Sequence, residues 1–213
     1  MVCYRLPIKV EWKSVMVGKR LFLAAMIVLG TLTTPAFGQN VYGSDGEEFV
    51  KAVRDRDGDK AIQLLRDRPT VLNARDTKGD TGLIVAISQR DPTWAGYLLN
   101  QGADLDLAAR NGDTPLLTAA RAGFLDAAQW LVEMGAKIDA ANRMGETPLI
   151  IAVQQRQVPI IKLLLAARAN PDKTDSAQGY SARDYAKRDN RGGEILRVIE
   201  AAKPKPATAA TSR

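Results

Sequence analysis

The sequence predicts an all-α repeat solenoid of about five helix-turn-helix units joined by short β-hairpin loops. Gly79, Gly112 and Gly145 recur at an interval of 33 residues, and each precedes an acidic residue and a threonine. Two leucines and an alanine recur in the same register: Leu83, Leu116 and Leu149; Ala86, Ala119 and Ala152; Leu98, Leu131 and Leu164. Self-similarity of this kind is typical of stacked units that bury their apolar faces against one another.

The central unit, residues 112–144, contains two short helical patterns. The first pattern follows Thr114, which can cap free backbone N–H groups, and Pro115, which suits the first position of a helix. The second pattern ends before Gly135, a residue type that readily adopts the left-handed conformation after a helix. Because helices this short are marginal alone in water, packing between units has to stabilise them.

These units resemble the ankyrin repeat, whose pattern is Gly-x-Thr-Pro-Leu-His-x-Ala-Ala, a second helix ending in leucines, then Gly-Ala-Asp and a hairpin. The segments TPLLTAA at 114–120, TPLIIAV at 147–153 and QGADLDLAARNG at 101–112 carry the resemblance. It covers residues 47–202 and implies a fold rather than an activity, since one fold hosts many functions.

The sequence departs from the ankyrin pattern at three kinds of position. In the second unit Gly82 stands in place of the proline, which is expected to weaken that helix start. In the second, third and fourth units an apolar residue replaces the histidine; these residues are Ile84, Leu117 and Ile150. The glycine that ends the first helix in the family is Arg90 in one unit and Arg156 in another, and only Gly123 keeps it. Apolar replacements can compensate by packing for a lost hydrogen bond, so the fold remains the expectation.

The expected units are residues 47–78, 79–111, 112–144, 145–178 and 179–202. In the first unit we expect helices over about 47–54 and 59–66 and a hairpin segment at 69–79. The first unit lacks the Thr-Pro-Leu entry and the last has no following hairpin, so both are expected to be polar caps.

Residues 1–38 are typical of a secretory signal peptide, and Met16 is an alternative start of the chain. A Lys-Arg pair precedes an apolar core at 21–32, and small residues before Gln39 suit cleavage there. The core is shorter than the roughly 20 residues of a membrane span. We therefore expect an exported, periplasmic protein, with an uncleaved leader that anchors the chain as the alternative.

Two further segments lie outside the repeats. Residues 39–46 are expected to be a linker, and residues 203–213, rich in Pro, Ala and Thr, a disordered tail. Net charge is +6 for the whole chain and +2 once residues 1–38 are set aside. A nearly neutral exported form gives no general case for binding nucleic acid or an anionic membrane.

The residue inventory argues against an enzyme. The chain has no histidine, and its single cysteine, Cys3, lies in the leader. The rest of the chain therefore offers no Ser-His-Asp or Cys-His arrangement, no zinc site of the usual types and no disulfide. We predict a non-catalytic protein that uses no cofactor or metal and is monomeric.

Three clusters are weaker candidates for chemistry: Asp104 and Asp106; Asp55, Asp57 and Asp59; Trp94, Tyr97 and Trp130. The first pair fits turn formation. The second surrounds a glycine in the manner of a calcium loop but lacks the sixth-position glycine and the bidentate glutamate, so a helix–helix turn explains it better. The aromatic set could line a ligand site, but its helical spacing favours core packing.

The resemblance implies a concave face, built from hairpin tips and first-helix surfaces, that binds another protein. The residues that map to this face are polar apart from one methionine: Thr77, Lys78, Asp80, Ser88, Gln89, Arg110, Asn111, Asp113, Arg121, Arg143, Met144, Glu146, Gln154 and Gln155. Arg110, Arg121 and Arg143 are the expected anchors, since arginine is enriched at interface hot spots. Their reversal to glutamate is expected to change stability by about 0.5 kcal/mol or less.

An envelope-associated structural factor is the alternative function. The uncleaved leader would anchor the chain, and its basic C-terminal region would contact anionic surface groups. Residues 180–213 hold eight basic and four acidic groups. Strong salt sensitivity and recovery with membranes would favour this alternative, because surface attraction between charges is screened by salt.

Overall fold

The computed structural model describes residues 44–189 and 193–202, all within one compact unit, Asn40–Arg213. The expected leader, its cleavage site before Gln39, the tail at 203–213 and the first part of the expected linker lie outside the described residues. The described residues form ten α-helices and one 3-10 helix.

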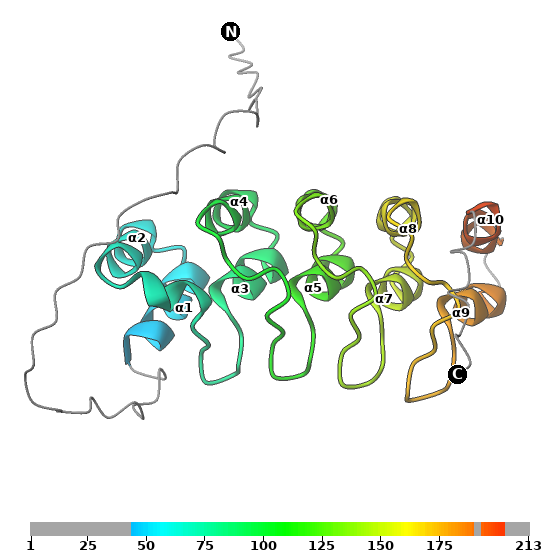
Figure 1. Ribbon diagram of the computed structural model, residues 1–213, viewed down its shortest axis with the longest axis horizontal. Coiled ribbons are helices and arrows are strands. Elements are labelled where there is room, and N and C mark those ends of the chain that lie inside the picture. Colours follow the sequence, from blue (N-terminus) through cyan, green and yellow to red (C-terminus); the bar gives the residue numbers. More distant parts are fainter. Residues whose placement is uncertain (1–43, 190–192, 203–213) are drawn as a thin grey trace, which may run out of the picture. The chain divides into compact units, whose positions relative to one another are not determined.

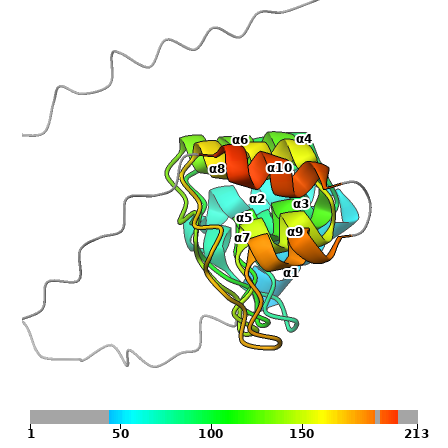
Figure 2. The ribbon, with the colours of Figure 1, turned by 90° about the vertical axis from the view of Figure 1, so that its right-hand side faces the viewer.

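The helices form two layers, and the hairpin loops extend from the first layer on the side away from the second (Figures 1 and 2). The first helices of the units are α1 (Ser44–Asp55), α3 (Gly82–Ser88), α5 (Pro115–Ala122), α7 (Pro148–Gln154) and α9 (Ala182–Arg188). The second helices are α2 (Gly58–Asp67), α4 (Pro92–Asn100), α6 (Leu125–Glu133), α8 (Val158–Ala166) and α10 (Glu194–Ala201). Along the first layer, helices of adjacent units pack on one another, and so do α4, α6, α8 and α10 in the second layer.

A side-chain cap begins each of the first helices from α3 onward. Thr81, Thr114 and Thr147 accept hydrogen bonds from the backbone N–H three residues later, at 3.2, 3.3 and 3.3 Å. Ser181 and Asp184 form a reciprocal capping box at α9. The expected cap at Thr114 and the helix start at Pro115 are confirmed.

The recurring leucines and alanines form the core. All nine are buried, and the leucines of the second helices, Leu98, Leu131 and Leu164, are 0% exposed. The alanines Ala86, Ala119 and Ala152 are also 0% exposed; they leave room for close packing between the two helices of each unit. The spacing of 33 residues thus places the same side chain in the same layer of every unit.

Two local expectations in the first unit are wrong. α1 begins at Ser44, so the end of the expected linker is helical; Asp45 and Glu47 in its first turn suit the positive end of the helix dipole. Pro69–Asn73 forms a 3-10 turn rather than one arm of a hairpin. Proline fixes a backbone angle that suits the start of such a turn. The expected hairpins carry isolated antiparallel bridges, Arg75 with Thr81 and Thr174 with Ser181.

Arginine occupies the left-handed conformation at four helix ends. Arg56, Arg90, Arg156 and Arg168 have φ of 59°, 54°, 56° and 63°. Arg90 and Arg156, which stand where the family has glycine, therefore keep the left-handed backbone conformation that Gly123 adopts in the third unit. For a residue with a Cβ this conformation costs roughly 1–2 kcal/mol. Arg56 and Arg156 each form an ion pair with an aspartate of the next unit, Asp91 and Asp189 respectively.

The recurring glycines lie at the hairpin tips, where the next hairpin packs against them. Gly79, Gly112 and Gly145 have φ of 82°, 87° and 77°. A Cβ on Gly112 would lie 2.7 Å from the backbone nitrogen of Arg143, and one on Gly79 would lie 2.8 Å from the Cβ of Arg110. Glycine is required here both for its backbone angle and for the close approach of the neighbouring loop.

Replacing Gly112 by alanine is expected to destabilise the fold by about 1–3 kcal/mol more than the same change at Gly102. The two glycines have φ of 87° and 86°, but nothing lies within 4 Å of a Cβ on Gly102. The comparison therefore separates the clash between hairpins from the cost of the backbone angle. Urea unfolding of the two variants measures the difference between their free energies of unfolding. Equal losses would show that the neighbouring hairpin shifts to accommodate the Cβ without strain.

Candidate functional site

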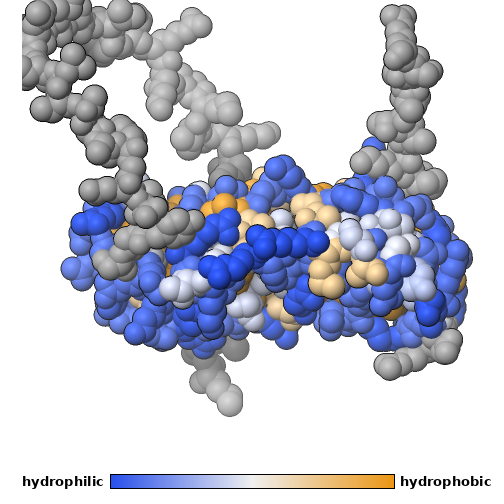
Figure 3. Space-filling view, turned by 90° about the horizontal axis from the view of Figure 1, so that it is seen from below, coloured by the Kyte–Doolittle hydropathy of each residue, from blue (hydrophilic) through white to orange (hydrophobic). Residues whose placement is uncertain are grey.

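The hairpin face comprises the hairpin tips and the exposed surfaces of the first helices, and it is mainly hydrophilic (Figure 3). Ten of the predicted binding residues are exposed on it: Thr77, Lys78, Ser88, Arg110, Asn111, Arg121, Arg143, Met144, Gln154 and Gln155. Asp80, Gln89 and Glu146 are partly buried. Gln89 is also tied to the first unit, since its side-chain amide donates to the carbonyl of Arg54 at 2.8 Å.

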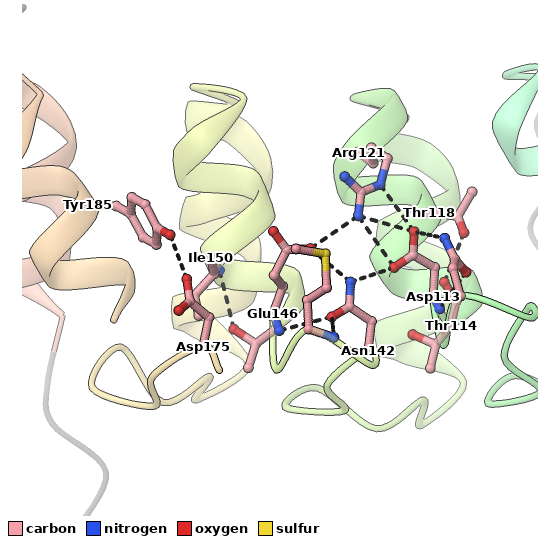
Figure 4. Close-up of polar contacts among 12 residues, drawn as sticks. Asp113, Thr114, Thr118, Arg121, Asn142, Glu146, Ile150, Asp175 and Tyr185 are labelled. Carbon is pink, nitrogen blue, oxygen red and sulfur yellow. Dashed lines mark hydrogen bonds and ion pairs between the residues drawn. The ribbon is translucent and has the colours of Figure 1, made fainter. Parts of the chain in front are cut away.

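Asp113 is buried, so its predicted role as a contact for a partner is wrong. It is 5% exposed and lies at the centre of a polar cluster (Figure 4). The side-chain amides of Asn111 and Asn142 donate to its carboxylate at 2.9 and 2.8 Å. The Arg121 guanidinium donates to the same carboxylate at 3.1 and 3.4 Å. These donors compensate the cost of burying the charge. Both carboxylate oxygens of Asp113 are therefore occupied within the fold and are not available to a partner.

Arg121 joins the third unit to the fourth. Besides its bonds to Asp113, it lies 3.5 Å from a carboxylate oxygen of Glu146. Asn142 completes the cluster by donating to Glu146 at 2.8 Å. The guanidinium is therefore committed to two acids within the fold (Figure 4). Reversing its charge is expected to cost more than the roughly 0.5 kcal/mol expected from the sequence.

A family model for ankyrin repeats (three copies) matches residues 49–142 and 97–175, which together span more than half of the chain. The chain belongs to the ankyrin-repeat family. Ankyrin repeats generally mediate protein–protein interaction, and ankyrin-repeat proteins are typically non-catalytic scaffolds. No curated protein matches the sequence.

The ankyrin array carries similar polar contacts in its other units. Asp76, Asn142 and Asp175 share one loop position, separated by multiples of 33 residues. Asp76 is held by Arg54 at 2.5 Å, and Asp175 accepts a hydrogen bond from Tyr185 at 2.5 Å. Sequence reasoning missed these contacts, although the recurrence of Asp or Asn at this position was a signal for them.

The environment of these polar contacts shifts the pKa of several groups, among them Asp76 and Tyr185. Burial alone would raise the pKa of Asp76, but hydrogen bonds from Arg54, Asp80 and Lys78 outweigh it and bring the pKa below its usual value. Burial, and then the hydrogen bond to Asp175, raise the pKa of Tyr185 to about 12. Asp76 is thus held in its charged form and Tyr185 as a neutral donor.

A groove of about 520 Å³ lies among the tips of the first three hairpins. It is lined by Arg75, Asp76, Gly79, Ala108, Ala109, Arg110, Gly112 and Arg143. We call it the arginine groove. It brings together two of the three expected anchors, Arg110 and Arg143, but not Arg121, and it adds Arg75, which sequence reasoning did not select.

The weaker candidate clusters have structural roles. Asp57 caps α2, and Asp104 accepts a hydrogen bond from the backbone of Asp106 in a loop. Trp94 and Tyr97 pack edge to face, with ring centroids 5.4 Å apart, and both lie against the core. In residues 44–189 and 193–202, no group of His, Cys, Asp and Glu side chains could hold a metal ion.

In the part of the chain that the structure describes, none of the helices is both long enough and apolar enough to cross a bilayer.

Proposed function

We propose that this ankyrin-repeat protein binds another protein through the hairpin face and has no catalysis of its own. Met144 is the main support. At 54% exposed, it is the most exposed large apolar side chain among the described residues. It lies on the tip of the third hairpin, close in sequence to the polar residues Asn142, Arg143 and Glu146, an arrangement that suits an apolar anchor with a polar rim.

The backbone of Met144 is already ordered for binding. Its N–H donates to the side chain of Asn142 at 2.9 Å, and its carbonyl accepts from the backbone N–H of Ser176 at 2.8 Å. Binding would therefore cost little further ordering of the loop. The free Met144 side chain can adjust to the surface of a partner, because methionine is flexible and polarisable.

The proposed setting is the periplasm, with the leader removed before Gln39 and the chain acting as a monomer. The basic, apolar and small-residue order of the leader supports export. The near-neutral charge of the remaining chain supports a protein partner over nucleic acid. Envelope association through an uncleaved leader is the second candidate, supported by the excess of basic groups in residues 180–213.

Replacing Met144 by alanine is expected to weaken retention of the partner about tenfold or more, because an apolar anchor contributes at least about 1.4 kcal/mol. The measurement is affinity capture from envelope extract, with identification and titration of the retained protein. Met134→Ala is the matched control: it removes the same side chain, which is 49% exposed at the end of α6.

Three outcomes would count against the proposal or limit it. Failure of the wild type to retain any protein overturns the binding function. Equal retention by both methionine variants would show that the partner uses a different surface. Retention that depends on membranes and disappears with salt would favour the envelope-associated alternative.

A further inference from the structure

We propose that the arginine groove binds an acidic segment of the partner protein, an extended stretch that bears several Asp or Glu side chains. This inference rests on the proposed protein-binding function and gives the chemistry of what is bound. It follows from three features of the groove: unpaired guanidinium groups, acids that are already occupied, and arginine stems held in place.

The three arginines of the groove lack acidic partners. Among the described residues, no carboxylate lies within 4.0 Å of the guanidinium of Arg75, Arg110 or Arg143. Arg75 donates to the carbonyl of Gly79 at 3.0 Å and to that of Ala108. Arg110 donates to the carbonyl of Thr77 at 2.8 Å. Neutral carbonyls leave the positive charges uncompensated.

The acids nearby cannot neutralise the groove. Asp76, which lines it, is paired with Arg54, and its side chain is 3% exposed. Asp113 is paired with Arg121, and its side chain is 7% exposed. The exposed charges around the groove, Arg110, Arg143 and Lys78, are cationic. Asp80, beside Gly79, is only partly exposed and lies 3.9 Å from Arg54. Such a surface attracts and orients a negatively charged segment.

The close packing of the hairpins positions the arginines. The Cβ of Arg110 lies against Gly79, and the Cγ of Arg143 lies against Gly112. The backbone N–H of Arg143 also donates to the carbonyl of Asn111 at 3.2 Å. Because the stems are already held, binding a carboxylate requires little ordering of the side chains.

The size and chemistry of the groove favour a protein segment over a larger polyanion. Small residues, Gly79, Ala108 and Gly112, also line the groove and leave room for a main chain. A guanidinium matches a carboxylate through two parallel hydrogen bonds. A nucleic acid or a membrane would instead need a broad basic surface, whereas residues 39–213 have a net charge of only +2.

The test measures binding of fluorescent oligoglutamate and oligoglutamine peptides of equal length to the purified full-length protein by fluorescence anisotropy. The groove variant is Arg110→Gln with Arg143→Gln; glutamine keeps the Cβ and Cγ atoms that pack on the glycines. The matched control is Arg66→Gln with Arg168→Gln, which removes two exposed arginines, one on α2 and one just after α8, that form no ion pair with another described residue. Thermal melting establishes that every variant is folded.

The wild type should bind oligoglutamate at least about tenfold more tightly than oligoglutamine. The groove variant should lose about tenfold in affinity for oligoglutamate, and the control variant about twofold at most. Equal affinity for the two peptides, or an unchanged groove variant, would overturn the inference. So would binding to phosphatidylglycerol vesicles that the groove variant loses while oligoglutamate fails to bind, since that result assigns the groove to a lipid surface.

Capture from extract separates failure of this inference from failure of the proposed function. If the groove variant retains the wild-type partner with unchanged affinity while Met144→Ala loses it, the binding function stands and the groove assignment fails. If the wild type retains no protein and binds no acidic peptide, both fail.

Discussion

Replacing Leu131 by alanine is expected to lower the free energy of unfolding by about 2–5 kcal/mol. Leu131 is 0% exposed on α6, in the central unit, and it belongs to the leucine layer shared with Leu98 and Leu164. The change removes buried methyl groups and leaves a cavity between units that pack on both sides. Urea unfolding followed by circular dichroism measures the loss.

Leu125→Ala on the same helix is the control, because this leucine is 37% exposed. It should cost about 1 kcal/mol or less. A loss below about 1 kcal/mol at Leu131 would show that the second-helix layer relaxes to fill the cavity. Both curves need fitting to more than two states if the slopes differ, since repeat arrays can unfold in parts.

Reversing Arg121 to glutamate is expected to destabilise the fold by about 2–4 kcal/mol. The new carboxylate would lie beside Asp113 and Glu146 and would remove the guanidinium that neutralises both. The cost falls near the lower end of the range for a broken buried pair, because the Arg121 side chain is 43% exposed.

Arg110→Glu is the matched control for this reversal. It changes the same charge on a neighbouring hairpin, where the Arg110 guanidinium donates to the carbonyl of Thr77 and has no acidic partner within the described part of the chain. Stability should therefore change by about 0.5 kcal/mol or less. Thermal and urea unfolding of the two variants measure the difference in their stabilities. Equal stability of the two proteins would mean that solvent screens the cluster around Asp113.

The sequence predicted the apolar layers well because they depend on local patterns that repeat. Leu131 has the same environment as Leu98 and Leu164, so alignment of the units was sufficient to place all three in the core. The helix start at Thr114 was predictable for a similar reason, since its cap contacts only the backbone N–H of Leu117. Such contacts join residues close in sequence.

The polar contacts were not predictable from single units. The ankyrin resemblance placed Asp113 on the binding face, but its partner Asn142 comes from the next hairpin. Arg121 was selected as an anchor for a partner, whereas Glu146 of the following unit binds it. The arginine groove likewise depends on which loops lie side by side, and Arg75 becomes part of it only in the stacked array.

The single-file packing of the first helices has a mechanical consequence. α1 packs on α3, α3 on α5, α5 on α7, and α7 on α9. Tension between the first and last of these helices would pass through the interfaces in series, and the softest of them would open while its neighbours stayed closed. The array is therefore expected to open one interface at a time rather than to unfold as a single block. A segment bound across two hairpins would strengthen the interface that it bridges.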